Sequence, residues 1–122
     1  MSGLSTIIGN QGEDAAVEWL RNAGFYIVER NWRIGHYEID IIAQRWDEIH
    51  FVEVKSRKTG GWSTPEQAID EHKFRSLKRA ASFYLALHHA VEEPFFDLMA
   101  VETLPNGELE LRFVEDAMQS HW

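Results

Sequence analysis

Two short apolar segments carry acidic side chains where the core of a sheet would normally hold hydrophobic ones. Residues 38–42 read EIDII and residues 51–55 read FVEVK. Burial of a carboxylate is unfavourable unless a cation or hydrogen-bond donors compensate it. Carboxylate oxygens are ligands that Mg²⁺ prefers, and a metal ion or lysine beside them can stabilise charge on a phosphoryl group. The pattern therefore predicts a metal-dependent site that cleaves phosphodiester bonds.

A hairpin would bring the two segments together. We expect strands at residues 38–44 and 49–56, joined by a short polar connection. With the turn centred between residues 46 and 47, antiparallel pairing puts Asp40 opposite Glu53. Residues opposed in this way project to the same side of the sheet, with Cβ atoms about 5 Å apart, and a slip of one residue would separate them. This register thus unites the two carboxylates.

Roles for the individual residues follow from this register. Asp40 and Glu53 would each supply a metal ligand, with the Val54 carbonyl as a third. Lys55 would orient the attacking water, lower its pKa, or stabilise charge on the phosphate. Glu38 falls opposite Lys55, where the two could instead form a surface ion pair worth less than about 1 kcal/mol. Asp40 and Glu53 would repel each other unless a cation lay between them, so a purely structural role suits that pair poorly.

A further carboxylate comes from the first expected helix, at about residues 10–23. Gly24 is suited to end this helix, because glycine readily adopts the left-handed conformation. At helical spacing Glu13 shares a side with Val17 and Leu20, the side that should pack on the sheet. It could bind metal through water or accept a proton. The alternative is an exposed first-turn glutamate favoured by the helix dipole.

The remaining elements complete an α/β fold in the order α-β-β-β-α-β-β, a mixed sheet flanked by helices. The second helix begins at Pro65 with Thr64 as its N-cap, or starts again at Asp70, and carries an apolar stripe that we expect in the core. Asp97 alternates with apolar neighbours and is expected to be a structural hydrogen-bond acceptor. Further strands are expected at residues 25–30, with a bend or extension at 31–35, and at 95–102 and 109–114.

Composition limits the class of protein. With 122 residues, 44% of them hydrophobic and 26% charged, the chain suits one globular domain spanning residues 1–122. It has no apolar run of the roughly 20 residues that a membrane span requires, and residues 1–8 lack the pattern of a signal peptide. The absence of cysteine excludes disulfides and thiolate metal sites. These features lead us to expect a cytoplasmic protein.

Charge is unevenly distributed along the chain. The net charge of −8 argues against a protein that simply coats nucleic acid. Residues 55–79 nevertheless hold 7 basic and 3 acidic side chains, whereas residues 80–122 hold 1 and 8. This basic segment follows the lysine of the second strand directly, although basic residues on an exposed helix are often only a solvated face. Trp62 is the best candidate for stacking on a base. The expected phosphate-binding residues are Arg33, Arg57, Lys58 and Lys73.

The ordered combination of these motifs resembles the YraN-type family of small uncharacterised bacterial proteins. The motifs are Gly12-Glu13, Asn31-Trp32-Arg33, Glu38-Ile39-Asp40, Phe51-Val52-Glu53-Val54-Lys55-Ser56-Arg57 and Lys73 before a basic helix. That family resembles archaeal Holliday junction resolvases of the PD-(D/E)xK nuclease superfamily, and the likeness runs from about residue 9 to 101. Two departures are the lack of a proline before Asp40 and a tyrosine, Tyr37, where glycine is usual.

The resemblance implies a restriction-endonuclease-like fold and a magnesium-dependent nuclease site, in which Mn²⁺ is expected to substitute for Mg²⁺. It implies that Asp40 and Glu53 bind the metal, that Lys55 is the catalytic lysine, and that Glu13 matches the first-helix glutamate. Resolvases cut two strands at symmetric positions, so a homodimer is expected by analogy.

Three functional hypotheses remain open at this stage. The leading one is a Mg²⁺-dependent endonuclease-like protein that acts on DNA, including branched or otherwise structured DNA. The second is a catalytically silent module that uses a nuclease fold to bind nucleic acid or protein. The third is a phosphodiesterase for small molecules, against which the wide basic segment argues.

Overall fold

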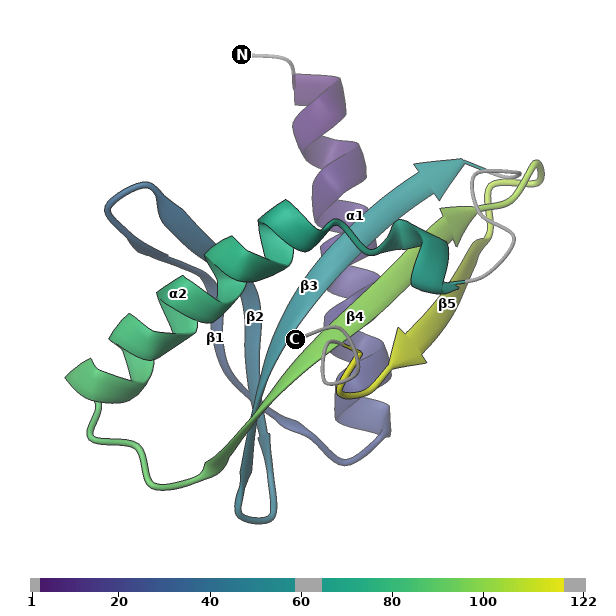
Figure 1. The fold of residues 1–122 in the computed structure, drawn as a ribbon. Coiled ribbons are helices and arrows are strands. Elements are labelled where there is room, and N and C mark those ends of the chain that lie inside the picture. Colours follow the sequence, from purple (N-terminus) through teal and green to yellow (C-terminus); the bar gives the residue numbers. More distant parts are fainter. Residues whose placement is uncertain (1–2, 59–64, 118–122) are drawn as a thin grey trace.

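The sheet and its two covering helices appear in the order that the sequence predicts (Figure 1). The computed structural model describes the backbone of residues 3–58 and 65–117, and the side chains of residues 11–58 and 67–117. The elements are α1 (Gly3–Asn22), β1 (Tyr26–Ile34), β2 (Tyr37–Arg45), β3 (Glu48–Lys58), the short 3₁₀ helix η1 (Pro65–Ala68), α2 (Glu71–Leu87), β4 (Glu93–Thr103) and β5 (Leu109–Val114).

The five strands form one mixed sheet in the order β1-β2-β3-β4-β5. Strands β3 and β4 are parallel, and the other neighbouring pairs are antiparallel. Helices α1 and α2 cover opposite faces of this twisted sheet (Figure 1). Each helix seals its own hydrophobic cluster, one around Phe51, Phe74 and Leu77 under α2 and one around Leu20 and Val52 under α1. The sheet is therefore buried on both faces near its centre.

The hairpin between β2 and β3 has the predicted register. Its Cα partners run from Arg45↔Glu48 to Ile41↔Val52. Trp46, at the turn, takes a left-handed conformation with φ of 58°. The register expected from turn position and side-chain alternation is confirmed over these pairs. Asp40 and Glu53 lie one position beyond the last of them.

The first helix is longer than expected, and the first strand takes the extension that was one of the two expectations for residues 31–35. Helix α1 begins at Gly3 rather than at about residue 10. Gly24 follows it with φ of 94°, and the Phe25 amide donates to the Leu20 carbonyl, so the predicted glycine stop is confirmed. Residues 31–34 continue β1 instead of bending away, with Asn31 in a left-handed conformation within the strand. Asparagine is among the residues that tolerate this conformation best.

The second helix is split where a continuous one starting at Pro65 was possible. Pro65 begins the short η1, and α2 starts anew after Asp70. The Asp70 carboxylate caps α2 by accepting a hydrogen bond from the Lys73 amide at 3.2 Å. The predicted apolar stripe packs in the core through Phe74, Leu77 and Tyr84, among others. The proposed cap at Thr64 and the stacking residue Trp62 lie outside the described residues.

The described helices include none that is both long and apolar enough to span a membrane. The part of helix α1 whose side chains are described, from Gln11 to Asn22, has buried residues at helical spacing and exposed residues between them. This is the pattern of a helix with one face on a protein core.

Candidate metal centre

Asp40 lies where the backbone pairing of β2 with β3 gives way to a side-chain contact. The Val54 amide donates to Asp40 Oδ2 at 2.9 Å, so the carboxylate takes the place of a backbone acceptor on β2. In a strand the N–H and C=O of one residue point to the same edge. The Val54 carbonyl, expected as a third metal ligand, therefore also points toward β2. This contact fixes the Asp40 side chain beside β3.

Asp40 and Glu53 form a pair of carboxylates that are poorly solvated and repel each other. Burial raises the pKa of Asp40 to about 6, an effect that the Val54 hydrogen bond reduces and the charges of Glu38 and Glu13 increase. Burial also raises the pKa of Glu53 to about 7, and the charge of Asp40 adds to that shift. A bound cation would interact favourably with both ionised groups at once.

Two lysines face this pair from different elements. Lys73, in the first turn of α2, has its Nζ 4.0 Å from Glu53 Oε2 and lowers the pKa of both carboxylates. Lys55, on β3, lowers the pKa of Glu53 to a smaller extent. The sequence predicted Lys55 beside the carboxylates and Lys73 as a phosphate contact. In the structure the helix lysine is the stronger cation at Glu53.

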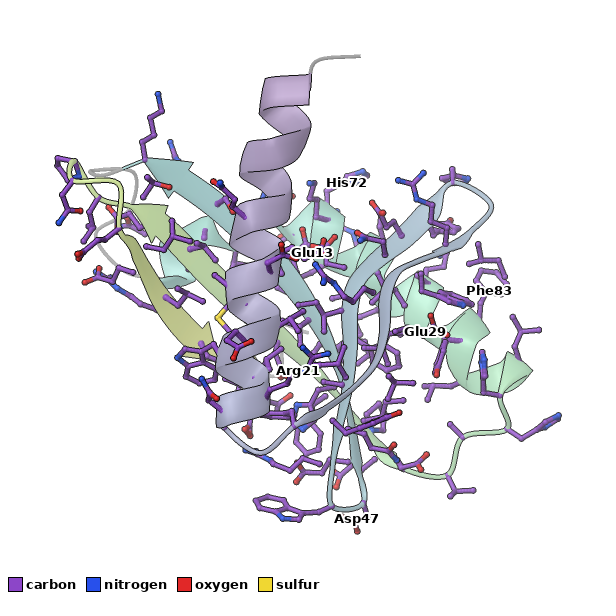
Figure 2. The ribbon with its side chains drawn as sticks, turned by 180° about the vertical axis from the view of Figure 1, so that it is seen from behind. Glu13, Arg21, Glu29, Asp47, His72 and Phe83 are labelled. Carbon is purple, nitrogen blue, oxygen red and sulfur yellow. The ribbon has the colours of Figure 1, made fainter. Side chains whose placement is uncertain are left out.

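Glu13 faces the sheet from α1 (Figure 2), as its helical position predicted. It is only 8% exposed. Its Oε1 accepts hydrogen bonds from Arg30 Nε at 3.1 Å and from Asn31 Nδ2 at 2.9 Å. Its charge also reaches Asp40 and raises the pKa of that group. The alternative of an exposed first-turn glutamate is wrong. Glu13 borders the pair, but β1 already holds one of its oxygens.

Gly12, next to Glu13, allows α1 to approach β3 closely. A Cβ atom added to Gly12 would lie 2.6 Å from Ser56 Oγ, closer than two such atoms can approach. The next contacts of that Cβ, with Ser56 Cβ and Val101 Cγ1, would be of ordinary length. Gly12 is therefore a point of close approach between helix and strand.

The four expected phosphate-binding residues do not form one cluster. Lys73 lies at the carboxylates, and Arg57 and Lys58 are exposed at the end of β3. Arg33 lies on the β1–β2 hairpin and donates to Glu38 at 3.1 Å. Glu38 thus pairs with Arg33, and the possible ion pair between Glu38 and Lys55 does not appear. Glu38 binds Arg33 rather than Lys55 because Arg33 lies in direct cross-strand register with it.

A cavity of about 460 Å³ opens beside Lys55. Its wall combines the end of β3, including Arg57, with the segment from Gln67 to Asp70. A second cavity, of about 590 Å³, lies between α1 and the ends of β3, β4 and β5, with Arg57 and Lys58 among its lining. The basic end of β3 therefore borders two cavities, one of which has Lys55 in its lining.

A separate polar cluster occupies the other end of β3, about 16 Å from Lys55 along the strand. Among the residues described, Glu48, His50 and Glu115 are the one group of three whose ligand atoms lie within 4.8 Å of one another. Arg45 already binds Glu115 at 2.7 Å, and the fully buried His50 bonds to Glu48 at 2.9 Å. Existing partners thus satisfy these groups, and we interpret the cluster as a structural charge network.

Asp97 completes that network. His50 Nδ1 lies 2.6 Å from Asp97 Oδ2, and the Asp116 amide donates to Asp97 Oδ1 at 2.7 Å. The expected role of Asp97 as a structural acceptor is confirmed. The spacing of the histidines did not indicate the network, because its members come from β3, β4 and the turn after β5.

Sequence reasoning also missed the residues that hold the candidate centre in place. Arg30 and Asn31 bind Glu13, and Asp70 positions Lys73. The motif Asn31-Trp32-Arg33 was the one available signal for the first contact, although it did not reveal a partner on α1. The capping pattern at Asp70 indicated a helix start, but it did not indicate that Lys73 in the first turn would lie against Glu53.

The donor set at Asp40 and Glu53 suits a divalent cation. Both groups offer carboxylate oxygens, which Mg²⁺ prefers, and the pair leaves room in its coordination for water or substrate oxygens. Burial is the largest cause of the raised pKa of each group, and a bound cation would favour the ionised form of both. Asp40 and Glu53 are accordingly the residues that would hold the ion.

Comparison with known proteins identifies relatives over most of the chain. The family model described as "Uncharacterised protein family UPF0102" matches residues 12–101. A UPF0102 protein of Symbiobacterium thermophilum is 40% identical over 118 residues, covering 96% of this chain and 100% of its own length. One of Persephonella marina is 49% identical over 82 residues, 67% of this chain and 71% of the relative. One of Bacteroides thetaiotaomicron is 37% identical, with 90% of each chain covered.

Proposed function

The chain belongs to the uncharacterised protein family UPF0102, and we propose that it is a Mg²⁺-dependent endonuclease-like hydrolase of DNA phosphodiester bonds. Its substrates include branched or otherwise structured DNA, and Mn²⁺ substitutes for Mg²⁺. One observation carries the proposal: the Val54 amide holds the Asp40 carboxylate against β3, next to the buried Glu53. Burial raises the pKa values of the two groups to about 6 and about 7. Such a pair destabilises the fold unless a cation compensates it, which favours a site retained for binding an ion.

The surrounding residues provide the other parts of a hydrolytic site. A divalent ion held by Asp40 and Glu53 supplies Lewis-acid polarisation of the phosphate and a more acidic bound water. Lys55 projects from the same strand as Glu53 and stabilises negative charge that develops on the phosphate. Glu13 keeps Arg30 and Asn31 beside the pair and adds negative charge next to Asp40.

The DNA backbone is proposed to run along the end of β3. The cavity beside Lys55 is lined by Arg57 and by Asp70, the N-cap of α2. Lys58 extends the basic surface beyond the strand pair. Phosphate contacts of this kind position a nucleic acid without reading its sequence, which suits an enzyme that recognises the shape of its substrate.

The cleavage assay that tests this proposal uses labelled four-way junctions, flaps, nicked duplexes and single strands, with and without Mg²⁺. Wild-type protein should cleave at least one of these structures in a metal-dependent way. Asp40→Asn and Lys55→Met should each lose about 10²-fold or more of that activity. Glu102→Gln, which alters a glutamate on β4 that is buried to the same extent as Glu53, serves as the matched control. Undiminished cleavage by Asp40→Asn and Lys55→Met would refute the assignment.

The alternative function is a binding module that holds nucleic acid or a protein partner without cutting. The engagement of Glu13 by Arg30 and Asn31 favours it, because these bonds withdraw one carboxylate oxygen from the site. The net charge of −8 is a second argument. Binding to the same DNA panel that weakens with salt, together with no cleavage in Mg²⁺ or Mn²⁺, would support this alternative.

A homodimer acting in the cytoplasm is part of the same proposal. Two sites related by two-fold symmetry could cut two strands of a junction at symmetric positions. Light scattering at several protein concentrations, with and without junction DNA, measures the assembly. A mass of one protomer in both conditions would contradict the dimer.

A further inference from the structure

Lys73 occupies an unexpected place for a residue whose predicted role was to bind nucleic acid. Its Nζ lies 4.0 Å from Glu53 Oε2. It also lowers the pKa of Asp40, so its positive charge acts on both members of the carboxylate pair. Its influence on Glu53 exceeds that of Lys55. Lys73 therefore serves as a counter-ion of the pair.

The two lysines differ in their freedom to leave. Lys55 belongs to the central strand β3, where its backbone lies in register with Ala100 of β4 and its side chain is half-buried. Lys73 reaches the pair from the surface, and its side chain is 56% exposed, whereas that of Glu53 is 12% exposed. The backbone of Lys73 is fixed, because its amide donates to the cap Asp70. A long exposed side chain on a fixed backbone can move its ammonium away without disturbing the fold.

We propose that Lys73 is a built-in competitor of the metal, an ammonium that lies against Glu53 until a divalent cation displaces it. This inference rests on the proposed function, because it concerns the same carboxylate pair. Two cations beside one pair of carboxylates repel each other, so each weakens binding of the other. The displaced Lys73 ammonium then becomes available for a DNA phosphate at the edge of the site. Metal and substrate binding are thereby coupled through one side chain.

As a competitor of the metal, Lys73 should affect the affinities for metal and for DNA in opposite directions, which a simple phosphate contact would not do. Removal of its charge should tighten binding of the metal alone, since the ion no longer competes with an ammonium. It should weaken binding of DNA in the presence of the metal. A residue that merely touched the DNA backbone would leave the affinity for the metal unchanged.

The test is isothermal titration of the DNA-free protein with Mg²⁺ at about pH 8.5, where the raised carboxyl groups are ionised. Lys73→Met should bind Mg²⁺ about 5-fold or more tightly than wild type, the range of a typical coupling between two sites. Lys73→Arg, which retains the charge, should stay near the wild-type affinity. Lys78→Met, on the same helix with its Nζ near the Phe96 ring, should match wild type.

The outcomes separate this inference from the proposed function. Wild-type protein that binds no Mg²⁺, or binds it equally well after Asp40→Asn, would overturn the metal site itself. Wild-type binding that Asp40→Asn abolishes and Lys73→Met leaves unchanged or weakens would overturn only the role of Lys73. Circular dichroism spectra of the variants should match wild type, as expected for a change at an exposed side chain.

Discussion

The carboxylate pair should make the metal-free protein less stable than it would be without its charge, and Glu53→Gln tests this. Burial and the charge of Asp40 raise the pKa of Glu53 from 4.5 to about 7. The folded state therefore holds this proton more tightly than the unfolded state. Between about pH 4.5 and 7 the unfolded chain has lost the proton and the folded protein has not, so the free energy of unfolding falls as the pH rises.

The magnitude follows from the size of the shift. Each pK unit corresponds to 1.36 kcal/mol, so a shift of about 2.5 units sets an upper limit of about 3.4 kcal/mol. Glutamine keeps the shape of the side chain and removes its charge. It also relieves the repulsion on Asp40 but abandons the ion pair with Lys73. We therefore expect Glu53→Gln to stabilise the protein at pH 8 by about 1–3 kcal/mol.

Urea unfolding in EDTA at about pH 4.5 and pH 8 measures the effect. Glu53→Gln should gain stability at the higher pH and little at the lower one, where the wild-type carboxyl is protonated. Glu102→Gln changes a glutamate of the same 9% exposure on β4 and should show no such gain. A Glu53→Gln protein that is no more stable than wild type at pH 8 would refute the reasoning that the pair is electrostatically strained.

Three further predictions concern the metal, the helix approach and the buried histidine. Mg²⁺ should bind more tightly as the pH rises through 6–7, because binding releases protons from Asp40 and Glu53. Calorimetry in buffers of different ionisation enthalpy measures this release. Binding without proton release would contradict the raised pKa values. Ser56→Ala should raise the thermal midpoint of the Gly12→Ala protein relative to its effect on wild type, because a Cβ at position 12 would lie 2.6 Å from Ser56 Oγ. An equal effect of Ser56→Ala in both proteins would contradict the close approach. Burial lowers the pKa of His50, but its two carboxylate partners raise it above the ordinary value, so the stability it contributes below about pH 6.5 should be lost as the pH rises further. His50→Phe should lack that alkaline loss in urea titrations above pH 7, and an identical loss in both proteins would disprove the charged network.

The sequence was sufficient to predict the parts of the site that depend on local pattern. The turn at residues 46 and 47 and the alternation of apolar residues determine the register of β2 with β3 up to Ile41↔Val52, and hence bring Asp40 close to Glu53 and Val54. Helical spacing likewise placed Glu13 on the buried face of α1. In each case, residues close in sequence contain the geometric information.

The sequence did not predict contacts between distant segments. The bonds from Arg30 and Asn31 to Glu13 depend on how α1 crosses β1, and the approach of Lys73 to Glu53 depends on where α2 starts over the sheet. Asp70 explains that start, yet the sequence offered Thr64 as an equal candidate. Glu38 had two basic residues within reach, and only the observed register with β1 selects Arg33.

The most direct measurement of the central claim is the position of a divalent ion in crystals grown with Mn²⁺, located by anomalous scattering. The account predicts a peak between the carboxylates of Asp40 and Glu53, coordinated by both, and its loss in Asp40→Asn crystals. A peak at Glu48, His50 and Glu115 instead, or none at Asp40 and Glu53 in saturating Mn²⁺, would contradict it.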